Sequence, residues 1–156
     1  MNTIINDQRF LSQLKRHEGF RSRVYLCTAG HRTIGYGHNL DSCPVAGIQD
    51  GDVISRSLAD EILWQDLAPL ERRLSRCIPH WNDITAARRA VLVNMAFNMG
   101  VDGLLKFRRM LGAVENSDWQ RAADEMLESE WVKQVKGRAF ELARQMQTGE
   151  WQEGQA

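Results

Sequence analysis

The stretch from residue 17 to residue 40, HEGFRSRVYLCTAGHRTIGYGHNL, contains residues whose types and spacing could carry out catalysis. Glu18 is followed nine positions later by Cys27, and Thr33 comes six positions after that. A carboxyl group can protonate a leaving oxygen, and a hydroxyl or a thiolate can position or activate water. Glycoside hydrolysis usually relies on two carboxylates. Here a thiol stands where the second carboxylate is expected.

The elements around these residues are predicted from local patterns. A short amphipathic helix is expected over residues 3–17, ending near Gly19, with Glu18 at its end. From Val24 to Leu40, glycines interrupt β-branched and aromatic residues, which is typical of a small antiparallel hairpin or meander. Because the strands of a hairpin run back alongside each other, we expect Cys27 and Thr33 to lie close together. Glu18 would face both across a gap wide enough for a sugar.

The rest of the chain is predicted to be helical. Ser55 is the expected N-cap of a long helix, and Ser117 with Gln120 predicts a capping box for a later one. Residues 90–99 are apolar on nearly all sides, as in a helix at the centre of a bundle. The long helix is predicted over residues 56–78, and a final helical stretch is predicted over about 137–146.

We therefore predict an α+β protein that is mainly helical, a single domain over residues 1–156 made of two unequal lobes. The small lobe, with a short antiparallel sheet, spans about 14–55, and a connecting helix spans about 56–78. The larger helical lobe spans about 80–156 and includes the first helix. We expect a cleft between the lobes, and clefts are where ligands bind.

Composition excludes several classes of function. The 156 residues carry no net charge, which gives no bulk attraction to nucleic acid or to an anionic membrane. The N-terminal residues hold no apolar run long enough for a signal peptide or a membrane span, so we expect no stable membrane insertion. Three cysteines at irregular spacing indicate free thiols in a reducing compartment, and no zinc pattern is present. We expect neither a metal nor a cofactor.

Several motifs of the chain, taken in order, resemble those of bacteriophage lysozymes, the endolysins of the T-even phage type. In the first segment the matching elements are Glu18-Gly19, Tyr25, Gly30 and Thr33-Ile34-Gly35-Tyr36-Gly37-His38. The resemblance continues in ARRAVLVNMAFNMG (87–100), SEWVKQVKGRA (129–139) and TGEW (148–151), so it covers nearly the whole chain.

The resemblance implies a lysozyme-like fold and a muramidase. Such an enzyme cuts the β-1,4 bond between N-acetylmuramic acid and N-acetylglucosamine in bacterial peptidoglycan, for host lysis at the end of a phage cycle. The protein is expected to be a monomer in the host cytoplasm. It would be released to the cell wall and periplasm with the help of a separate pore-forming protein.

The resemblance also assigns roles to residues. The general acid falls on Glu18, and the family's aspartate and threonine, which position the attacking water, fall on Cys27 and Thr33. The supporting positions are His38, which pairs with Asp66 between the lobes, and Arg138, which lies near the catalytic glutamate. The positions that line the saccharide cleft are Asn39 and Phe97, although the family has an apolar residue where Asn39 stands.

The role of Cys27 is open at this point. A free thiol has a pKa near 8.5, and a neighbouring glutamate anion would raise it, so little thiolate is expected at neutral pH unless His31 or an arginine lowers the pKa. As a thiolate, Cys27 could act as a base for water or attack the anomeric carbon. As a neutral thiol it would only shape the water site, with Thr33 orienting the water. A disulfide with Cys43 would inactivate the enzyme, and Cys77 is expected to be buried in the apolar register of its helix.

Three other functions compete with the muramidase. A lytic transglycosylase needs a single glutamate and no second carboxylate. A wall amidase or peptidase would use Cys27 as nucleophile with His31 or His38 as base, although nothing resembles its local cysteine signature. A module that only binds the wall needs no catalytic residue. Residues 103–114 mix apolar and basic side chains, which fits either a lobe-packing helix or an element that acts on outer membranes.

Overall fold

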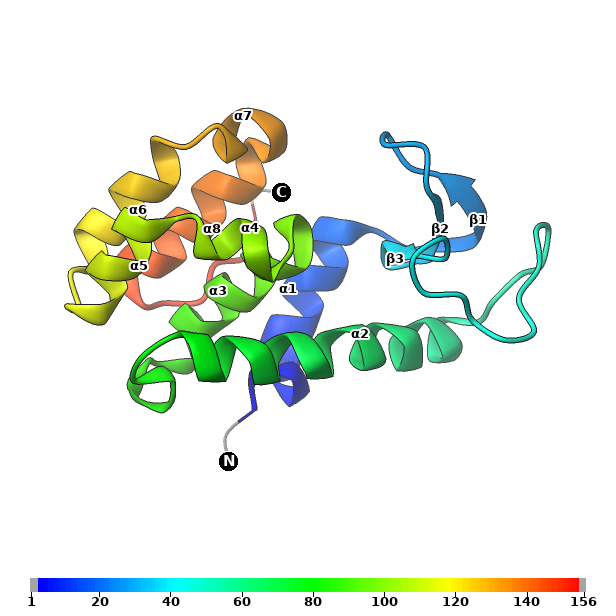
Figure 1. Ribbon diagram of the computed structural model, residues 1–156, viewed down its shortest axis with the longest axis horizontal. Coiled ribbons are helices and arrows are strands. Elements are labelled where there is room, and N and C mark those ends of the chain that lie inside the picture. The colour runs from blue at the N-terminus through cyan, green and yellow to red at the C-terminus, as the bar shows by residue number, and fades with distance from the viewer. Residues whose placement is uncertain (1–2, 155–156) are drawn as a thin grey trace. The chain divides into compact units, whose positions relative to one another are not determined.

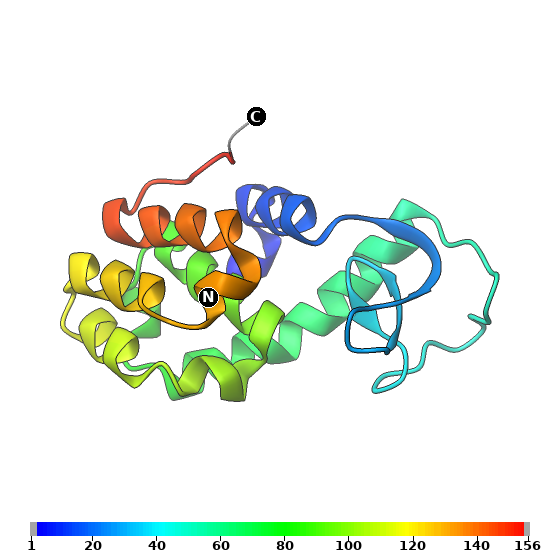
Figure 2. The same ribbon diagram turned by 90° about the horizontal axis from the view of Figure 1, so that it is seen from above.

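The computed structural model describes residues 3–154. The chain forms two compact units. Residues 11–69 form the sheet unit, and the described parts of 1–10 and 70–156 form the helical unit. Helices α1 (Gln8–Glu18) and α2 (Arg56–Cys77) each contribute residues to both units. Figure 1 shows the elements in chain order, and Figure 2 shows them from above.

The sheet unit contains a three-stranded antiparallel sheet in the order β1-β2-β3, which confirms the α+β class. The strands are β1 (Arg21–Leu26), β2 (Arg32–Gly35) and β3 (His38–Asn39). The register places Tyr25 opposite Thr33 and Ile34 opposite His38, with an irregularity between Arg21 and Tyr25. The predicted hairpin is therefore present, and its turn lies between Leu26 and Arg32.

Helix α2 packs against the sheet at a glycine. Gly35 has a φ of +67°, and a methyl group there would lie 3.4 Å from Cβ of Ala59. The missing side chain therefore permits both the left-handed backbone and the close approach of β2 to α2. The N-terminus of α2 is capped as predicted, because Oγ of Ser55 accepts the N–H of Leu58 at 3.1 Å.

The helical unit is arranged around α3 (Ala86–Met99), whose residues 90–96 are all buried. This confirms the prediction of a central helix. Helix α6 (Trp119–Leu127) packs against both α5 (Arg108–Glu115) and α8 (Gly137–Thr148), and the three run side by side in Figures 1 and 2. The remaining elements are η1 (Ile4–Asn6), η2 (Trp81–Asp83), α4 (Val101–Leu105) and α7 (Trp131–Val135).

A buried carboxyl group anchors Ile4 to α2. Oε2 of Glu71 accepts the N–H of Ile4 at 2.6 Å. Burial raises the pKa of Glu71, although the N–H of Ile4, the charge of Arg89 and the N–H of Ile5 oppose this shift. The side chain of Glu71 thus serves as a hydrogen-bond acceptor inside the helical unit.

Two predicted helix starts differ from the structure. The first helix is interrupted at Asp7, because its Oδ1 accepts the N–H of Arg9 at 2.8 Å and starts α1 as a separate helix after η1. The prediction of a capping box at Ser117 and Gln120 is wrong. Ser117 has a φ of +56°, and the neighbouring Asp118 caps α6 by accepting the N–H of Arg121. A side-chain cap from either position satisfies the same free N–H groups.

The prediction that Cys77 is buried is wrong. Leu74 and Ile78 are buried, so the apolar face continues from residue 74 to residue 78 and leaves Cys77 exposed at the end of α2. Cys27 is half-buried, Cys43 is exposed, and all three thiols are free. Of the helices within residues 3–154, none is long and apolar enough to cross a membrane.

Candidate active site

Glu18 is the last residue of α1, and its carboxylate lies against Gly37. The helix ends where the N–H of Gly19, which has a φ of +72°, donates to the carbonyl of Lys15 at 2.8 Å. A methyl group on Gly37 would lie 3.5 Å from Oε2 of Glu18 and 3.8 Å from its Cδ. Gly37, with a φ of +82°, therefore allows the turn between β2 and β3 to approach the carboxylate without covering it with a side chain.

Cys27 and Thr33 meet across the turn between β1 and β2, as the hairpin predicted. Tyr25 and Leu26 pair with Thr33 and Arg32 in the sheet, which places Cys27 directly after the paired segment. The side chain of Thr33 is near enough to the thiol to lower the pKa of Cys27. The hydroxyl of Thr33, which is buried, also lies 2.9 Å from the carbonyl oxygen of His31, to which it can donate.

The pKa of the Cys27 thiol is lowered, which is the outcome that was expected only if His31 or an arginine acted on the thiol. The main cause is the N–H of His31, and partial desolvation opposes it. The N–H of Ala29, the side chain of Thr33 and the N–H of Gly30 lower the pKa further. Successive backbone N–H groups in a turn form an anion-binding nest, which stabilises a thiolate as it would a carboxylate.

Tyr25 lies close to both predicted catalytic groups. Burial raises its pKa, the guanidinium of Arg21 opposes the shift, and the charges of Glu18 and Cys27 raise it further. The guanidinium of Arg21 lies 4.8 Å from the centre of the Tyr25 ring. Glu18 and Cys27 therefore act electrostatically on the same phenol, which places them in one region of the sheet unit.

His38 and Asp66 form the expected pair. Nδ1 of His38 lies 2.7 Å from Oδ2 of Asp66, and Nε2 lies 2.7 Å from the carbonyl oxygen of Cys43. Both residues belong to residues 11–69, so the prediction that the pair joins two lobes is wrong. Asp66 is placed there because the N-terminal part of α2, up to Pro69, packs with the sheet.

Asn39 is engaged by its own turn. Its Oδ1 accepts the N–H of Asp41 at 2.9 Å and the N–H of Ser42 at 3.1 Å. This is an Asx turn, in which the side-chain oxygen replaces a backbone acceptor. The amide oxygen of Asn39 is therefore occupied, and the predicted contact with saccharide would fall to its NH₂ group.

A family model described as phage lysozyme matches residues 15–147. The match includes Glu18, Cys27 and Thr33, and it extends over both units. The chain belongs to the phage lysozyme family. The lysozyme fold class and the enzyme class that the sequence motifs predicted are thus confirmed.

Relatives of this lysozyme come from phages and from Dictyostelium discoideum. The pre-baseplate central spike protein of Enterobacteria phage T4 is 36% identical over 155 residues, which cover 87% of this chain and 27% of the spike protein. A probable T4-type lysozyme of Dictyostelium discoideum is 28% identical, with 87% and 92% coverage. An endolysin of Acyrthosiphon pisum secondary endosymbiont phage 1 is 28% identical over 136 residues, with 86% coverage of each chain.

The lysozyme carries its other two predicted site residues in the helical unit. Nε and Nη2 of Arg138, on α8, donate to Oδ1 of Asn94 on α3 at 3.0 and 2.8 Å. Asn94 is fully buried, so it fixes the guanidinium from inside the unit. Phe97 is half-buried one turn further along α3. Glu18 belongs to the sheet unit, and the expected proximity of Arg138 to Glu18 stays a prediction.

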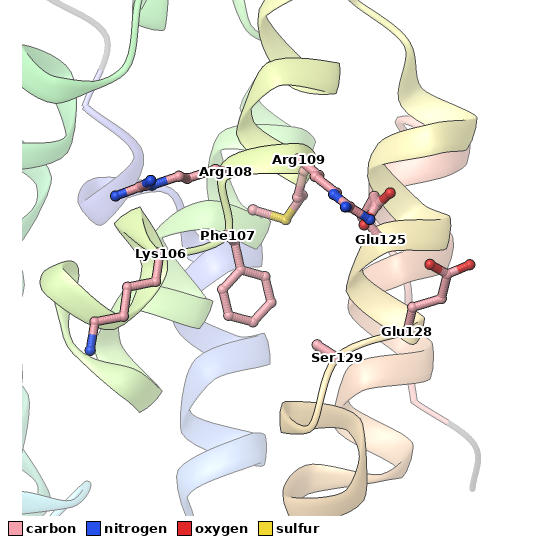
Figure 3. Close-up of a pocket in the computed structure, with 8 residues that line it drawn as sticks. Lys106, Phe107, Arg108, Arg109, Glu125, Glu128 and Ser129 are labelled. Atoms are coloured by element: carbon pink, nitrogen blue, oxygen red, sulfur yellow. The ribbon is translucent and has the colours of Figure 1, made fainter.

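The helical unit also contains a hollow of about 470 Å³. Phe107 lies in the middle of its lining, and Arg109 extends toward Glu125 (Figure 3). The remaining lining residues are Lys106, Arg108, Met110, Glu128 and Ser129. The basic residues of segment 103–114 line this hollow. The segment contains the end of α4 and most of α5. The lining of three cations and two carboxylates suits a ligand that carries charges of both signs.

Sequence reasoning missed several groups that hold the site together. Asn94 is a polar residue within the apolar run AVLVNMAF, and that contrast could have indicated a buried anchor. The carbonyl of Cys43 and the N–H groups of the turn at residues 29–31 have no sequence signature, because any residue supplies them. Asp41, which binds the same turn, looked like an ordinary loop residue.

Proposed function

We propose that this lysozyme hydrolyses the β-1,4 bond between N-acetylmuramic acid and N-acetylglucosamine in bacterial peptidoglycan. The observation that carries the proposal is the arrangement of the sheet unit. The Glu18 carboxylate lies against Gly37, while Cys27 directly follows the segment of β1 that pairs with Thr33 and Arg32. A proton donor and a water-handling pair are the two parts that glycoside hydrolysis requires.

In the proposed reaction, Glu18 donates its proton to the glycosidic oxygen as the bond to the anomeric carbon breaks. The Cys27 thiolate, stabilised by the N–H of His31 and its neighbours, takes a proton from the attacking water. Thr33 has one O–H, which can donate either to the His31 carbonyl or to the Cys27 thiolate, and in both cases its oxygen can accept a hydrogen bond from that water. The water oxygen bonds to the anomeric carbon. Glu18 and Cys27 then return to their starting protonation states by exchange with solvent.

The hollow of the helical unit would support binding of the polymer. Peptidoglycan carries peptide stems with both carboxylates and amines, and these match the mixed charges around Phe107. Such contacts would lie outside the chemistry itself and would add binding energy that is the same in the ground state and the transition state.

The biological role that fits the family is host lysis at the end of a phage cycle. The endolysin among the relatives supports this role, and 86% of its length is matched. In this role the protein works as a monomer, and a separate pore-forming protein gives it access to the wall.

A second role is favoured by the higher identity to the spike protein, 36% against 28% for the endolysin. The chain would then be one domain of a phage particle and would open the wall at entry. An antibody against the chain would detect it in purified particles of the encoding phage. In the lysis role it would be found in the soluble lysate and would be absent from particles.

The catalytic assignment is tested by comparing the wild type with Glu18→Gln in the solubilisation of purified peptidoglycan. Gln keeps the size of the side chain and cannot donate the proton, so we expect the variant to retain no more than a few per cent of the activity. Its circular dichroism and thermal midpoint should match the wild type. Substantial activity in Glu18→Gln would refute the role of Glu18, and a wild type that binds the wall without releasing fragments would indicate a binding module.

A further inference from the structure

One peptide group, between His31 and Arg32, links the two residues that handle water in the proposed function. Its carbonyl oxygen accepts the N–H of Cys27 at 3.0 Å and lies 2.9 Å from the hydroxyl of Thr33. The N–H of His31, on the preceding peptide, is the main cause of the lowered pKa of the Cys27 thiol. A rotation of this segment would therefore change the surroundings of Cys27 and Thr33 together.

The other side of that peptide group is held by Asp41. Oδ2 of Asp41 accepts the N–H of Arg32 at 3.0 Å and lies 3.7 Å from Nδ1 of His31. A peptide group is planar, so fixing the direction of its N–H also fixes the direction of its carbonyl oxygen. A carboxylate that accepts the N–H also polarises the peptide, which strengthens the carbonyl as an acceptor.

Asp41 is itself held in place by the turn that follows β3. Its backbone N–H donates to Oδ1 of Asn39 at 2.9 Å, and the N–H of Leu40 donates to the carbonyl of Arg32 at 2.8 Å. The peptide at His31–Arg32 is thus held by a chain of hydrogen bonds that begins at β3 and passes through the turn after it. Asn39, which was expected to contact saccharide, supports this scaffold.

We propose that Asp41 is a positioning residue for the hydrolytic step, acting through the His31–Arg32 peptide on Cys27 and Thr33. This inference rests on the proposed function, because it assigns Asp41 to the water side of that reaction. Asp41 touches neither Cys27 nor Thr33 through any contact that the described residues show, so its effect passes through the peptide group.

The test measures the Cys27 thiol directly. In a Cys43→Ser, Cys77→Ser background, the rate of alkylation by iodoacetamide is followed against pH, and its midpoint gives the ionisation of Cys27. We expect Asp41→Ala to move the midpoint upward by about half a pH unit or more, because the nest around the thiolate loosens. Asp41→Asn keeps an acceptor for the Arg32 N–H, so it should restore most of the wild-type midpoint.

Asp50→Ala is the matched control. Asp50 contacts only the guanidinium of Arg32 among the contacts that the structure gives, and it leaves the peptide N–H untouched. Its removal should leave the alkylation midpoint and the wall-hydrolysis rate unchanged. Asp41→Ala, in contrast, should lower kcat for soluble peptidoglycan fragments by about 10-fold with little change in KM, because binding is intact and the water is misplaced.

An Asp41→Ala protein that melts normally with an unchanged alkylation midpoint would overturn the proposal, whatever its activity. So would an equal shift in Asp50→Ala. The thiol measurement needs no enzymatic turnover, so it tests the scaffold even if the wild type fails to hydrolyse peptidoglycan. That failure would count against the proposed function alone.

Discussion

The imidazole of His38 is held at 2.7 Å from the carboxylate of Asp66. Its other nitrogen lies at the same distance from the carbonyl of Cys43. A neutral imidazole has one N–H, so only the imidazolium can donate to both acceptors. The hydrogen bond with Asp66 therefore raises the pKa of His38, with a further contribution from Cys43, while burial of the ring opposes the shift.

We expect the pKa of His38, measured by NMR titration, to lie above the value of about 6.5 of an unfolded chain. The pair then contributes its full stabilisation below that unfolded value, and the contribution is lost as pH rises through the folded pKa. Asp66→Asn should lower the free energy of unfolding by about 1 to 3 kcal/mol at pH 5.5, and by less at pH 9. Asp83→Asn, which removes an exposed pair with His80, should have almost no effect. A His38 pKa at or below the unfolded value would refute the pair's role.

The second prediction concerns Cys27. Because the thiolate is the proposed base, Cys27→Ala and the isosteric Cys27→Ser should each lose activity on the order of 100-fold or more, the size of a general-base contribution. Cys27→Asp should remain active, since a carboxylate is charged at pH 7 and occupies the same nest. Hydrolysis rates on soluble peptidoglycan fragments would show this pattern. A loss of only severalfold in Cys27→Ala would mean that the thiol merely shapes the site.

Alkylation provides an independent check on Cys27. Cys43 and Cys77 are more exposed, so accessibility alone would make them react first. We expect Cys27 to react fastest at pH 7, because its pKa is lowered, and activity to fall in proportion to its modification. Full activity after quantitative alkylation of Cys27 would remove the thiol from the mechanism. The assays need reductant, since a disulfide between Cys27 and Cys43 would mimic the loss.

A third prediction concerns Gly37, and it separates the effect of backbone strain from the effect of a methyl group placed next to Glu18. Gly37→Ala forces a methyl group into a left-handed backbone and places it 3.5 Å from Oε2 of Glu18. Gly47→Ala meets the same strain, since Gly47 also has a φ of +82°, but it has open space around it. Both should lose about 1 kcal/mol of stability, measured by urea unfolding. Only Gly37→Ala should lose activity, and equal activity in the two variants would contradict the placement of Glu18.

The fourth prediction concerns Glu71, whose pKa is raised by burial. A carboxyl group with a higher pKa in the folded state reduces stability as pH rises from the unfolded pKa, about 4.3, through the folded one. Glu71→Gln keeps the acceptor for the Ile4 N–H without the charge. Its thermal midpoint should exceed that of the wild type at pH 7, and the difference should shrink toward pH 3.5.

Glu71→Ala is the control for this carboxyl group. It leaves the N–H of Ile4 without its acceptor and should cost about 1 to 3 kcal/mol at pH 3.5, and less at pH 7, where it also removes the buried charge. If the difference in thermal midpoint between Glu71→Gln and the wild type is independent of pH, ionisation of Glu71 does not affect folding.

The sequence predicted elements whose patterns are local. The Ser55 cap, the hairpin that brings Cys27 to Thr33 and the buried helix α3 follow from side-chain types at fixed spacing. Cys77 was misjudged because a helical register cannot tell which of two neighbouring positions at a helix end faces the core, and Ile78 occupies that place. Ser117 was misjudged because Asp118 competes for the same role.

The candidate site was predictable in its side chains and unpredictable in its main-chain contacts. Glu18, Cys27, Thr33 and His38 stand out as chemical groups. The lowered pKa of Cys27 depends on N–H groups whose direction is set by the turn at residues 28–31, and no residue type specifies that direction. The hydrogen bond from the N–H of Arg32 to Asp41 likewise depends on the path of the backbone and not on a residue type.

Mass spectrometry of the fragments released from purified peptidoglycan tests the central claim most directly, because the product records which bond was cut and what attacked it. The proposed reaction, with Glu18 as acid and water as nucleophile, predicts disaccharide peptides with a reducing-end muramic acid. In ¹⁸O-labelled water each new reducing end should gain one label. Anhydro-muramic acid without label would show a lytic transglycosylase, and free stem peptides would show an amidase or peptidase; either product would contradict the account.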